Sequence, residues 1–345
     1  SSYDYDVHGN VKELIQVYNS QELMVLNQHI KHVEYEYDLV SGNVNQVTYQ
    51  KGKQDQFMHR YCYDSDNRIK IAQTSKDGIV WEKDAKYFYY DHGPLARTEL
   101  GEKKVQSCDY AYTIQGWLKT VNGEQVDHTT MMGQDGKQTT INSQNGRDAH
   151  GFSLSYFDND YESYATSQPQ PHMLNYSPNL NSPATSLYNG NIRAIMTALV
   201  DVDENMGTNA PLKTHQTTYT YDQLNRIKSM EGNYREIGQS PVASGYSSNY
   251  SFDENGNLET LQRFANNGTA SVLMDDFDYK YDEDVSNGFN GGQNNRLLYV
   301  TDGAGASLFG DADIDISMAT YNTLGNYNYE YDEIGQLIKD RDEGI

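Results

Sequence analysis

The sequence is poor in cysteine, in basic residues and in long apolar runs. Two cysteines among 345 residues cannot build a disulfide-dense scaffold. No segment approaches the roughly 18 consecutive apolar residues of a transmembrane helix, so we expect no membrane span. The 26 Lys and Arg residues stand against 49 Asp and Glu, and the resulting net charge of -23 argues against a nucleic-acid partner because it repels phosphate.

Apolar residues are also scarce, at 37% of the chain, whereas an ordinary globular protein has roughly 45–50%. The aromatic residues are dominated by tyrosine, with 30 Tyr against 9 Phe and 2 Trp. Disordered chains are poor in aromatic residues. The composition therefore favours a folded, acidic protein in which tyrosine supplies much of the packing surface.

Tyrosine is followed directly by aspartate far more often than chance predicts. Random placement would give about three such pairs in a chain of this composition. The pair occurs after Tyr3, Tyr5, Tyr37, Tyr63, Tyr90, Tyr221, Tyr281 and Tyr331. Most of these tyrosines have a second aromatic residue two positions earlier, as in YEYD and YTYD, so the pattern indicates an internal repeat.

Each repeat reads as a β-hairpin. Aromatic residues at i and i+2 share one face of a strand, and the following Asp accepts hydrogen bonds from turn N–H groups. Gly or Asn three residues later tolerates a positive φ, and an aliphatic residue then starts the return strand. The residues assigned to these roles are Tyr5, Asp6, Gly9, Tyr37, Asp38, Tyr63, Asp64, Asn67, Tyr90, Asp91, Gly93, Tyr112, Gly116, Tyr221, Asp222, Asn225, Phe252, Asp253, Gly256, Tyr281, Asp282, Tyr331, Asp332 and Gly335.

A single hairpin cannot bury its aromatic face, so neighbouring hairpins must pair edge to edge. We therefore expect an all-β fold with very little helix, built as one continuous, spiralling antiparallel sheet of repeated hairpins. Repeats are predicted over 1–121 and 216–345. An irregular Pro/Gly/Asn-rich insertion in the same sheet is predicted over 122–215, and a separate subdomain there stays an open alternative.

Two further segments depart from the repeat. Residues 20–33 carry the chain's one helical apolar stripe, which also suits a strand. Residues 283–328 are rich in Gly and Asn and are expected to form long loops, although one repeat resumes at Asn295.

The motif Tyr-x-Tyr-Asp-x-x-Gly/Asn-x-Leu/Ile/Val resembles the signature of the YD-repeat, or Rhs-repeat, family, and the likeness covers nine places between Tyr3 and Leu337. The sequence segments 86–101, 109–123 and 151–161 are most similar to secreted Rhs-repeat proteins of the Bacteroidetes group. This resemblance implies a hollow shell, or cocoon, of the kind found in toxin-complex cocoons and teneurins. It implies a secreted or cell-surface location.

The resemblance also implies partners. In bacterial members of the family the shell encloses a C-terminal toxic domain, so the expected partners are the remainder of the shell and an enclosed cargo domain, with surface glycans or secretion-machinery proteins as further candidates. The family's self-cleavage motif resembles D-P-x-G, and this sequence has no Asp-Pro dipeptide. We therefore transfer neither self-cleavage nor toxicity, and we expect the chain to be a segment of a longer shell protein.

The sequence offers little catalytic chemistry. It has no G-x-S-x-G, H-E-x-x-H or Walker motif, and the glycines that start at Gly303 fit a flexible loop better than a dinucleotide site. We predict no enzymatic activity and no cofactor. We assign no metal either; the weak candidates for a cation are Asp201 with Asp203, whose loop departs from EF-hand spacing, and the alternating Asp311, Asp313 and Asp315, which also suit a solvated acidic edge.

Two smaller features have plain structural interpretations. His29 and His32 have metal-compatible spacing, but a surface pair is the favoured interpretation. Cys62 and Cys108 are predicted to be two buried thiols rather than a disulfide.

Two functions remain after these exclusions. The first is structural: the wall of a shell that encloses a cargo or toxin domain. The alternative is a cell-surface carbohydrate-binding or adhesion module, because exposed tyrosine rings stack on sugars. A β-propeller ranks last, since the repeat interval is too short for four-stranded blades.

Overall fold

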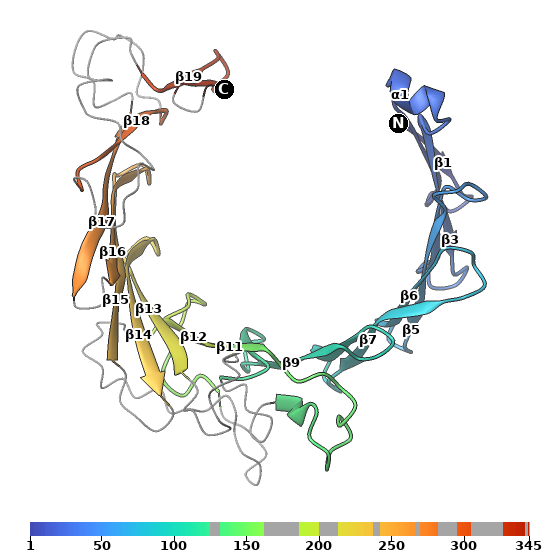
Figure 1. Ribbon diagram of the computed structural model, residues 1–345, viewed down its shortest axis with the longest axis horizontal. Helices are drawn as coiled ribbons and strands as arrows, with labels where there is room; N and C mark the ends of the chain where they lie inside the picture. The colour runs from blue at the N-terminus through green and yellow to red at the C-terminus, as the bar shows by residue number, and fades with distance from the viewer. Residues whose placement is uncertain are drawn as a thin grey trace. The chain divides into compact units, whose positions relative to one another are not determined.

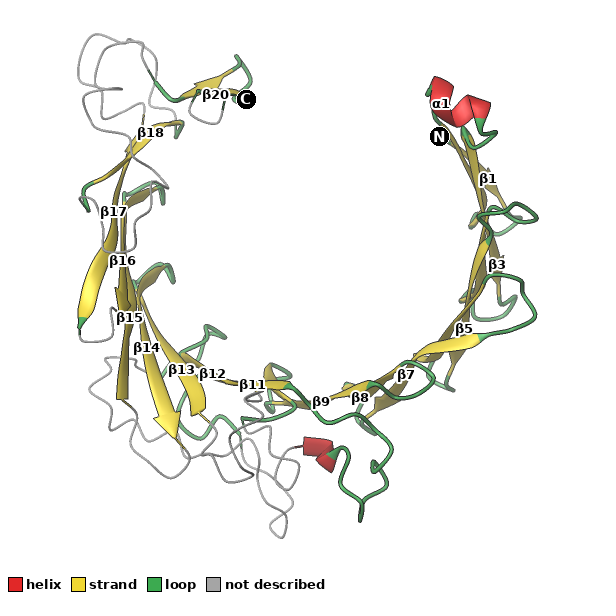
Figure 2. Ribbon diagram, viewed as in Figure 1, coloured by secondary structure: helices red, strands yellow, loops and turns green. Residues whose placement is uncertain are grey.

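The computed structural model describes residues 1–124, 132–161, 186–199, 213–236, 242–266, 270–281, 295–304, 327–341 and 344. Over these residues the chain is nearly all β, and helix is confined to two short segments (Figure 2). Strands β1 to β18 belong to one 18-stranded sheet, and β19 pairs with β20. The predicted all-β antiparallel sheet of repeated hairpins is confirmed.

The chain forms two compact units, and the boundary between them falls after Gly151, inside β11. Within each unit, strands that follow one another in sequence lie side by side (Figure 1). The first unit contains β1 (Ser2–Tyr5), β2 (Val11–Val17), α1 (Gln21–Val25), β3 (Ile30–Tyr37), β4 (Val44–Tyr49), β5 (Phe57–Tyr63), β6 (Ile69–Ser75), β7 (Glu82–Tyr89), β8 (Leu95–Leu100), β9 (Gln106–Tyr112), β10 (Leu118–Val121) and the 3₁₀ turn η1 (Met132–Gln134).

The second unit begins within β11 (His150–Ser155). Two strands, β11 and β12, lie in the part of the sequence predicted to be an insertion, and β18 lies where long loops were predicted. The later strands are β12 (Ala194–Leu199), β13 (Lys213–Tyr221), β14 (Ile227–Glu236), β15 (Val242–Phe252), β16 (Leu258–Asn266), β17 (Ser271–Tyr281), β18 (Leu297–Asp302), β19 (Tyr329–Tyr331) and β20 (Leu337–Asp340).

The segment 20–33 is divided between helix and strand. Ser20 caps α1 by accepting the N–H of Leu23 at 3.5 Å, and the helix ends after Val25. From Ile30 onward the chain pairs with β2, beginning with Val17 opposite Ile30. Both interpretations of the apolar stripe were therefore partly right.

Every hairpin of the repeat has a β-bulge at the same place. The last residue of the first strand pairs with the first residue of the second strand. The second residue of the second strand is the bulge residue, and no residue of the first strand lies opposite it in the register. Tyr5 pairs with Val11, for example, while Asp4 pairs with Glu13, which leaves Lys12 unpaired. The residues at the equivalent bulge position are Asn45, Lys70, Ala96, Lys119, Lys228, Glu259, Leu298 and Ile338. A bulge bends its strand and increases the local twist, so each hairpin has the same local distortion.

The bulge corrects the assignment of one repeat. The motif suggested Tyr90 as the strand-ending tyrosine and Asp91 as the turn aspartate. The structure shows instead that Tyr89 pairs with Leu95 and ends β7. Tyr90 lies in the turn position that Asp occupies elsewhere, because its N–H bonds the carbonyl of Pro94 and its carbonyl accepts the N–H of Gly93. Because Tyr89 and Tyr90 are adjacent, the motif placed the start of this turn one residue too late.

In five of the hairpins the strand-ending tyrosine ties the hairpin to the previous one. Its hydroxyl donates a hydrogen bond to a backbone carbonyl at or just before the start of the previous hairpin's second strand. The pairs are Tyr37 to Val11 at 2.8 Å, Tyr63 to Val44 at 2.7 Å, Tyr89 to Ile69 at 2.7 Å, Tyr221 to Ile192 at 2.7 Å and Tyr281 to Leu258 at 3.1 Å. The carbonyls of Val11, Val44, Ile69 and Leu258 lie next to a bulge, so the tyrosine satisfies an acceptor where the ladder is irregular.

The described residues have only a small apolar core. Buried polar and charged residues outnumber buried apolar ones, and alanine is the most frequent of the buried apolar residues. One cluster packs Leu298 and Tyr299 with Tyr327. Cohesion of the sheet therefore depends on its backbone ladders and on side chains that bond laterally between hairpins.

We predict that Tyr63→Phe lowers the free energy of unfolding by about 1 kcal/mol, because the carbonyl of Val44 loses its hydroxyl donor while the ring still packs. Tyr221→Phe has the same expected effect in the second unit. Urea denaturation followed by circular dichroism measures both. The matched control is Tyr5→Phe, since the Tyr5 side chain is 56% exposed and its hydroxyl has no hydrogen-bond partner among the described residues. An equal loss in all three variants would contradict the lateral role.

Candidate functional site

The turn aspartate of each repeat organises its hairpin. In the β5–β6 turn, Asp64 Oδ1 accepts the N–H groups of Asp66 and Arg68, both at 2.9 Å. The backbone of Asp64 closes the turn as well, because its N–H bonds the carbonyl of Arg68 and its carbonyl accepts the N–H of Asn67. The same arrangement recurs at Asp6, Asp222 and Asp332, and Asp253 accepts the N–H of Asn257.

The residue three positions after the aspartate has a left-handed backbone. Asn67 and Asn225 have φ of 62° and 65°, and glycine supplies the same conformation in the other turns of this length. Their φ values are 88° at Gly9, 83° at Gly116, 94° at Gly256 and 89° at Gly335. The Asp38 turn is one residue longer, with Gly42 at 74°. Gly93, at 119°, completes the shifted turn that starts at Tyr90.

These contacts keep the turn carboxylates ionised. The backbone N–H of Arg68, its guanidinium and the N–H of Asp66 hold the pKa of Asp64 below its usual value, against an opposing effect of desolvation. Hydrogen bonds from turn N–H groups likewise lower the pKa of Asp38 and Asp222. The pKa of Asp6 is also lowered, because hydrogen bonds from Asn10 and His8 outweigh desolvation. Much of the chain's acidic charge therefore serves turn structure.

An arginine directly after the left-handed residue ties its turn to the next one. Arg226 bonds the carboxylate of its own turn, Asp222, at 2.6 Å and the carbonyl of Asp253 in the following turn at 2.8 Å. Its guanidinium also lies 4.9 Å from the ring centre of Phe252. Arg68 and Arg296 repeat these contacts, with Tyr89 and Gly93 and with Tyr331 and Asp332 respectively.

Asparagine side chains bond along the same row of turns. Asn43 Nδ2 donates to Asn67 Oδ1 at 3.1 Å, and Asn257 Nδ2 donates to Asn295 Oδ1 at 3.1 Å. Asn189 Nδ2 reaches Asn225 Oδ1 at 2.6 Å. These Arg and Asn roles were not predicted from the repeat motif, although the sequence signals them by the recurrence of Asn-Arg at 67–68, 225–226 and 295–296.

A second polar site lies on β8 and β9 of the first unit. We call it the Arg97 cluster; it consists of Arg97, Glu99, Asp109, Asp135 and Asp148, all at most 9% exposed. The Arg97 guanidinium bonds the carboxylates of Asp109 and Asp135. Asp148 differs from the others, because neither of its carboxylate oxygens has a hydrogen-bond partner among the described residues.

The residues 132–149 form the cover of this cluster, and we call them the 132–149 loop. Asn145 Nδ2 donates to Glu99 Oε1 at 3.0 Å and to Ser107 Oγ at 2.7 Å, and the N–H of Gly146 bonds the carbonyl of Lys104 at 2.9 Å. A Cβ on Gly133 would collide with Asp109 and Arg97, and one on Gly146 would collide with the backbone of Val105. The loop therefore sits directly on the strands.

Burial changes the ionisation of the Arg97 cluster. It raises the pKa of Asp148 to about 8, and the nearby charges of Asp135 and Asp109 add to the effect while Arg97 opposes it. Burial also raises the pKa of Asp109 and of Asp135, although Arg97 counters it in both. The pKa of Glu99 is lowered, because hydrogen bonds from Asn145 and Lys104 outweigh its burial.

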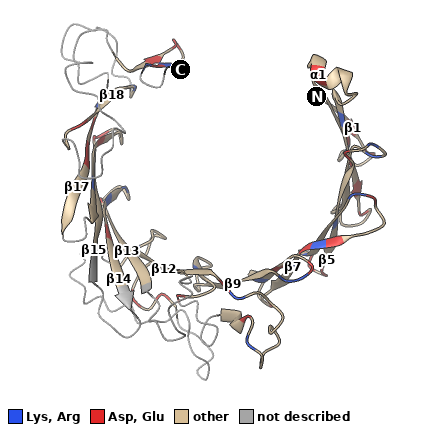
Figure 3. Ribbon diagram, in the orientation of Figure 1, with Lys and Arg blue, Asp and Glu red and all other residues tan. Residues whose placement is uncertain are grey.

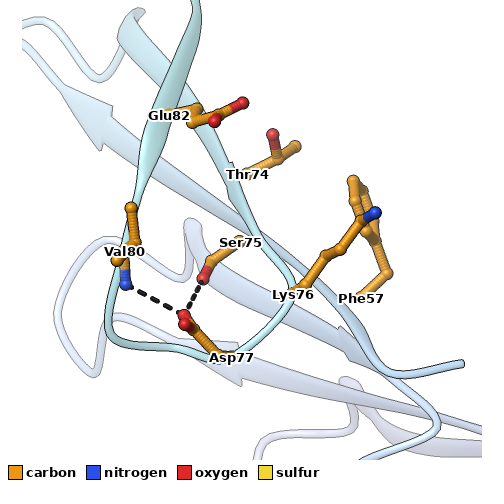
Figure 4. Close-up of a pocket in the computed structure, with 7 residues that line it drawn as sticks. All are labelled: Phe57, Thr74, Ser75, Lys76, Asp77, Val80 and Glu82. Carbon is orange, nitrogen blue, oxygen red and sulfur yellow. Dashed lines mark hydrogen bonds between the residues drawn. The ribbon is translucent and has the colours of Figure 1, made fainter. Parts of the chain in front are cut away.

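A cavity of about 270 Å³ lies beside the β6–β7 turn and is lined by Phe57, Thr74, Ser75, Lys76, Asp77, Val80 and Glu82 (Figure 4). Its size is near the lower limit of small-molecule sites. The Asp77 carboxylate accepts the N–H groups of Ile79 and Val80 and the Ser75 hydroxyl, so the turn already uses it. Nothing in this lining resembles a nucleophile with its base.

The histidine pair and the two cysteines do not form a metal site or a disulfide in the described residues. His32 Nδ1 lies 2.7 Å from Glu13 Oε1 on the adjacent strand, and no group of three acidic, His or Cys residues suited to a metal occurs in the described ranges. Both cysteines are free, as predicted. The prediction that both are buried was wrong: Cys108 is only partly buried, and Cys62 is exposed because it faces away from Tyr61 and Tyr63 on β5.

The candidate cation ligands Asp201, Asp203, Asp311, Asp313 and Asp315, and the turn residue Asp282, lie outside the described residues. Acidic and basic positions occur in both units (Figure 3). In the part of the chain that the structure covers, no helix has the length and apolar character needed to cross a membrane.

Comparisons with known proteins support the fold. No protein-family model and no curated protein matches the sequence. The fold is similar to a solved structure of the Tc holotoxin pore of Photorhabdus luminescens, with a TM-score of 0.51 and 15% identity over 97% of this chain and 14% of that chain. A crystal structure of TcdB2–TccC3 aligns over 97% of this chain and 15% of that chain at 12% identity, and its TM-score of 0.38 is too low to compare folds. This chain thus spans about one seventh of the solved holotoxin chain, and the likeness concerns the fold alone.

We predict that Asp64→Ala lowers the melting temperature at pH 7 and that the difference from wild type narrows as the pH falls below about 4. The folded-state pKa of Asp64 lies below the unfolded value, so its contribution is present above about pH 4 and is lost as the pH falls through the folded pKa. Calorimetry across this range provides the measurement. Asp91→Asn is the control, because Asp91 is exposed. A difference that stays constant down to pH 2 would contradict the capping role.

We predict that Arg226→Lys destabilises the sheet by about 1 kcal/mol, since an ammonium cannot bond Asp222 and Asp253 together while lying over Phe252. A double-mutant cycle with Phe252→Leu isolates the stacking part. We expect the two changes to couple by roughly 0.5 kcal/mol or more in urea denaturation. Strict additivity would show that the ring and the guanidinium do not interact.

Proposed function

We propose that this chain is a wall segment of a hollow YD-repeat shell that encloses a cargo polypeptide, such as a toxic domain, in a secreted or cell-surface protein. The observation that carries the proposal is the lateral tie: a tyrosine hydroxyl reaches the preceding hairpin and an arginine reaches the following one. Such ties let hairpins be added one after another without a closed globular core.

The polar character of the sheet supports a wall. Threonine and glutamine occupy buried positions on β13, where a two-layer sandwich would place large aliphatic side chains. A wall must tolerate water or a polar cargo on its faces, and tyrosine provides an apolar ring with a polar end. The fold similarity to the Tc holotoxin chain agrees with this role.

The proposed role is structural and non-enzymatic. Its partners are the remainder of the shell and the enclosed polypeptide, and the carboxylates described above serve turns and ion pairs rather than a reaction.

A second candidate is a carbohydrate-binding or adhesion surface. Its support is an aromatic platform in the second unit, where Phe157 and Tyr188 stack with ring centres 4.7 Å apart and Tyr188 is 73% exposed. Exposed aromatic faces of this kind stack on sugar rings.

Protease protection in the natural full-length polypeptide tests the wall. We expect an enclosed domain to be digested at least tenfold more slowly than the same domain expressed alone. Arg226→Ala combined with Tyr221→Phe should speed its digestion by weakening the lateral ties, whereas Tyr5→Phe should not. Equal digestion of the joined and isolated domains would refute encapsulation. Binding to a glycan array that is lost in Tyr188→Ala would favour the second candidate.

A further inference from the structure

The 132–149 loop contains Asp148, the one carboxylate of the Arg97 cluster that has no hydrogen-bond partner among the described residues. Asp148 is 1% exposed, whereas its sequence neighbours Arg147 and Ala149 are exposed. Its side chain is therefore directed into the cluster while the chain on either side faces solvent. An ionised carboxylate in such a place lacks both water and a donor, which makes the charged form costly.

Charged and titratable groups face Asp148 from the loop and from the two strands beneath it. Asp135 belongs to the loop itself, Asp109 and the thiol of Cys108 belong to β9, and Arg97 belongs to β8. Beyond Arg97 lie Glu99 on β8 and Lys104 in the β8–β9 turn.

The single guanidinium in this group is already shared. Arg97 bonds Asp109 and Asp135 and lies 3.8 Å from Glu99, while neither oxygen of Asp148 has a hydrogen-bond partner among the described residues. An ionised Asp148 would add a negative charge beside two others.

We propose that the 132–149 loop is a proton-dependent latch, which stays on β8 and β9 while Asp148 carries a proton and lifts from them when Asp148 is ionised. The loop is suited to this motion because the hydrogen bonds of Asn145 and Gly146 and the ion pair of Asp135 with Arg97 hold it, rather than an apolar core. In an enclosing wall, the device would loosen one patch of the sheet as the pH rises.

The direction of the pH effect follows from linkage. The pKa of Asp148 is about 8 in the closed loop and close to 3.8 once the side chain is in water. The closed form thus holds one more proton than the open form between these values, and the open-to-closed ratio rises up to about tenfold per pH unit across that range. Above pH 8 both forms are ionised and the ratio levels off.

Hydrogen exchange of the purified chain, read by mass spectrometry at pH 5, 6.5 and 8, tests the latch. Wild type and Asp148→Asn are compared at the same pH, so the pH dependence of exchange chemistry cancels. We expect the ratio of wild-type to variant exchange rates over 132–149 to rise by at least tenfold from pH 5 to pH 8. Asp91→Asn, an exposed control in the same unit, should match wild type throughout.

A flat ratio would overturn the proposal. So would faster exchange of Asp148→Asn at every pH, because the carboxylate itself would then hold the loop. Calcium added at pH 8 gives a third outcome: slower exchange in wild type alone would place a cation, rather than a proton, beside Asp148. Should the variant perturb the rest of the unit, the wild type alone decides, since protection over 132–149 must fall with pH relative to protection over β3.

Discussion

A tyrosine hydroxyl donated to a carbonyl of the preceding hairpin is the contact on which the rest of this sheet depends. Backbone ladders alone hold strands together, but they leave the carbonyl beside each bulge without a regular partner. Tyr37, Tyr63 and Tyr89 each supply that partner from the neighbouring hairpin. The tyrosine-rich composition and the modest apolar core follow from this arrangement, because the ring packs on the sheet while the hydroxyl completes the backbone.

The carboxylates of the chain fall into two groups with opposite pH behaviour. Turn aspartates such as Asp64 favour the charged form, so their contribution weakens in acid. Asp148 favours the neutral form, so its contribution weakens as the pH rises. The environment explains the difference: Asp64 accepts two backbone N–H groups at a half-exposed turn, whereas Asp148 lies buried without a donor among the described residues.

Much of the fold could be predicted from the sequence because local residue preferences in each repeat indicate the first strand, the turn and the return strand. The turn geometry at Asp222 and Asn225 follows from those preferences alone. The shift at Tyr89 could not be found in this way, because two adjacent tyrosines fit the same motif and only the ladder decides between them. The Arg97 cluster also escaped prediction, since Arg97, Asp135 and Asp148 are far apart in sequence and no motif joins them.

The bulge beside each turn sets the step by which a protein of this kind can grow or shrink. Side chains alternate between the two faces of a strand, so loss of a single residue such as Lys70 would exchange the faces for the remainder of β6. Removal of a complete hairpin with its bulge leaves the alternation of every other strand unchanged. Chain length in this architecture is therefore quantised, and evolution can vary the extent of the sheet freely only in whole hairpins.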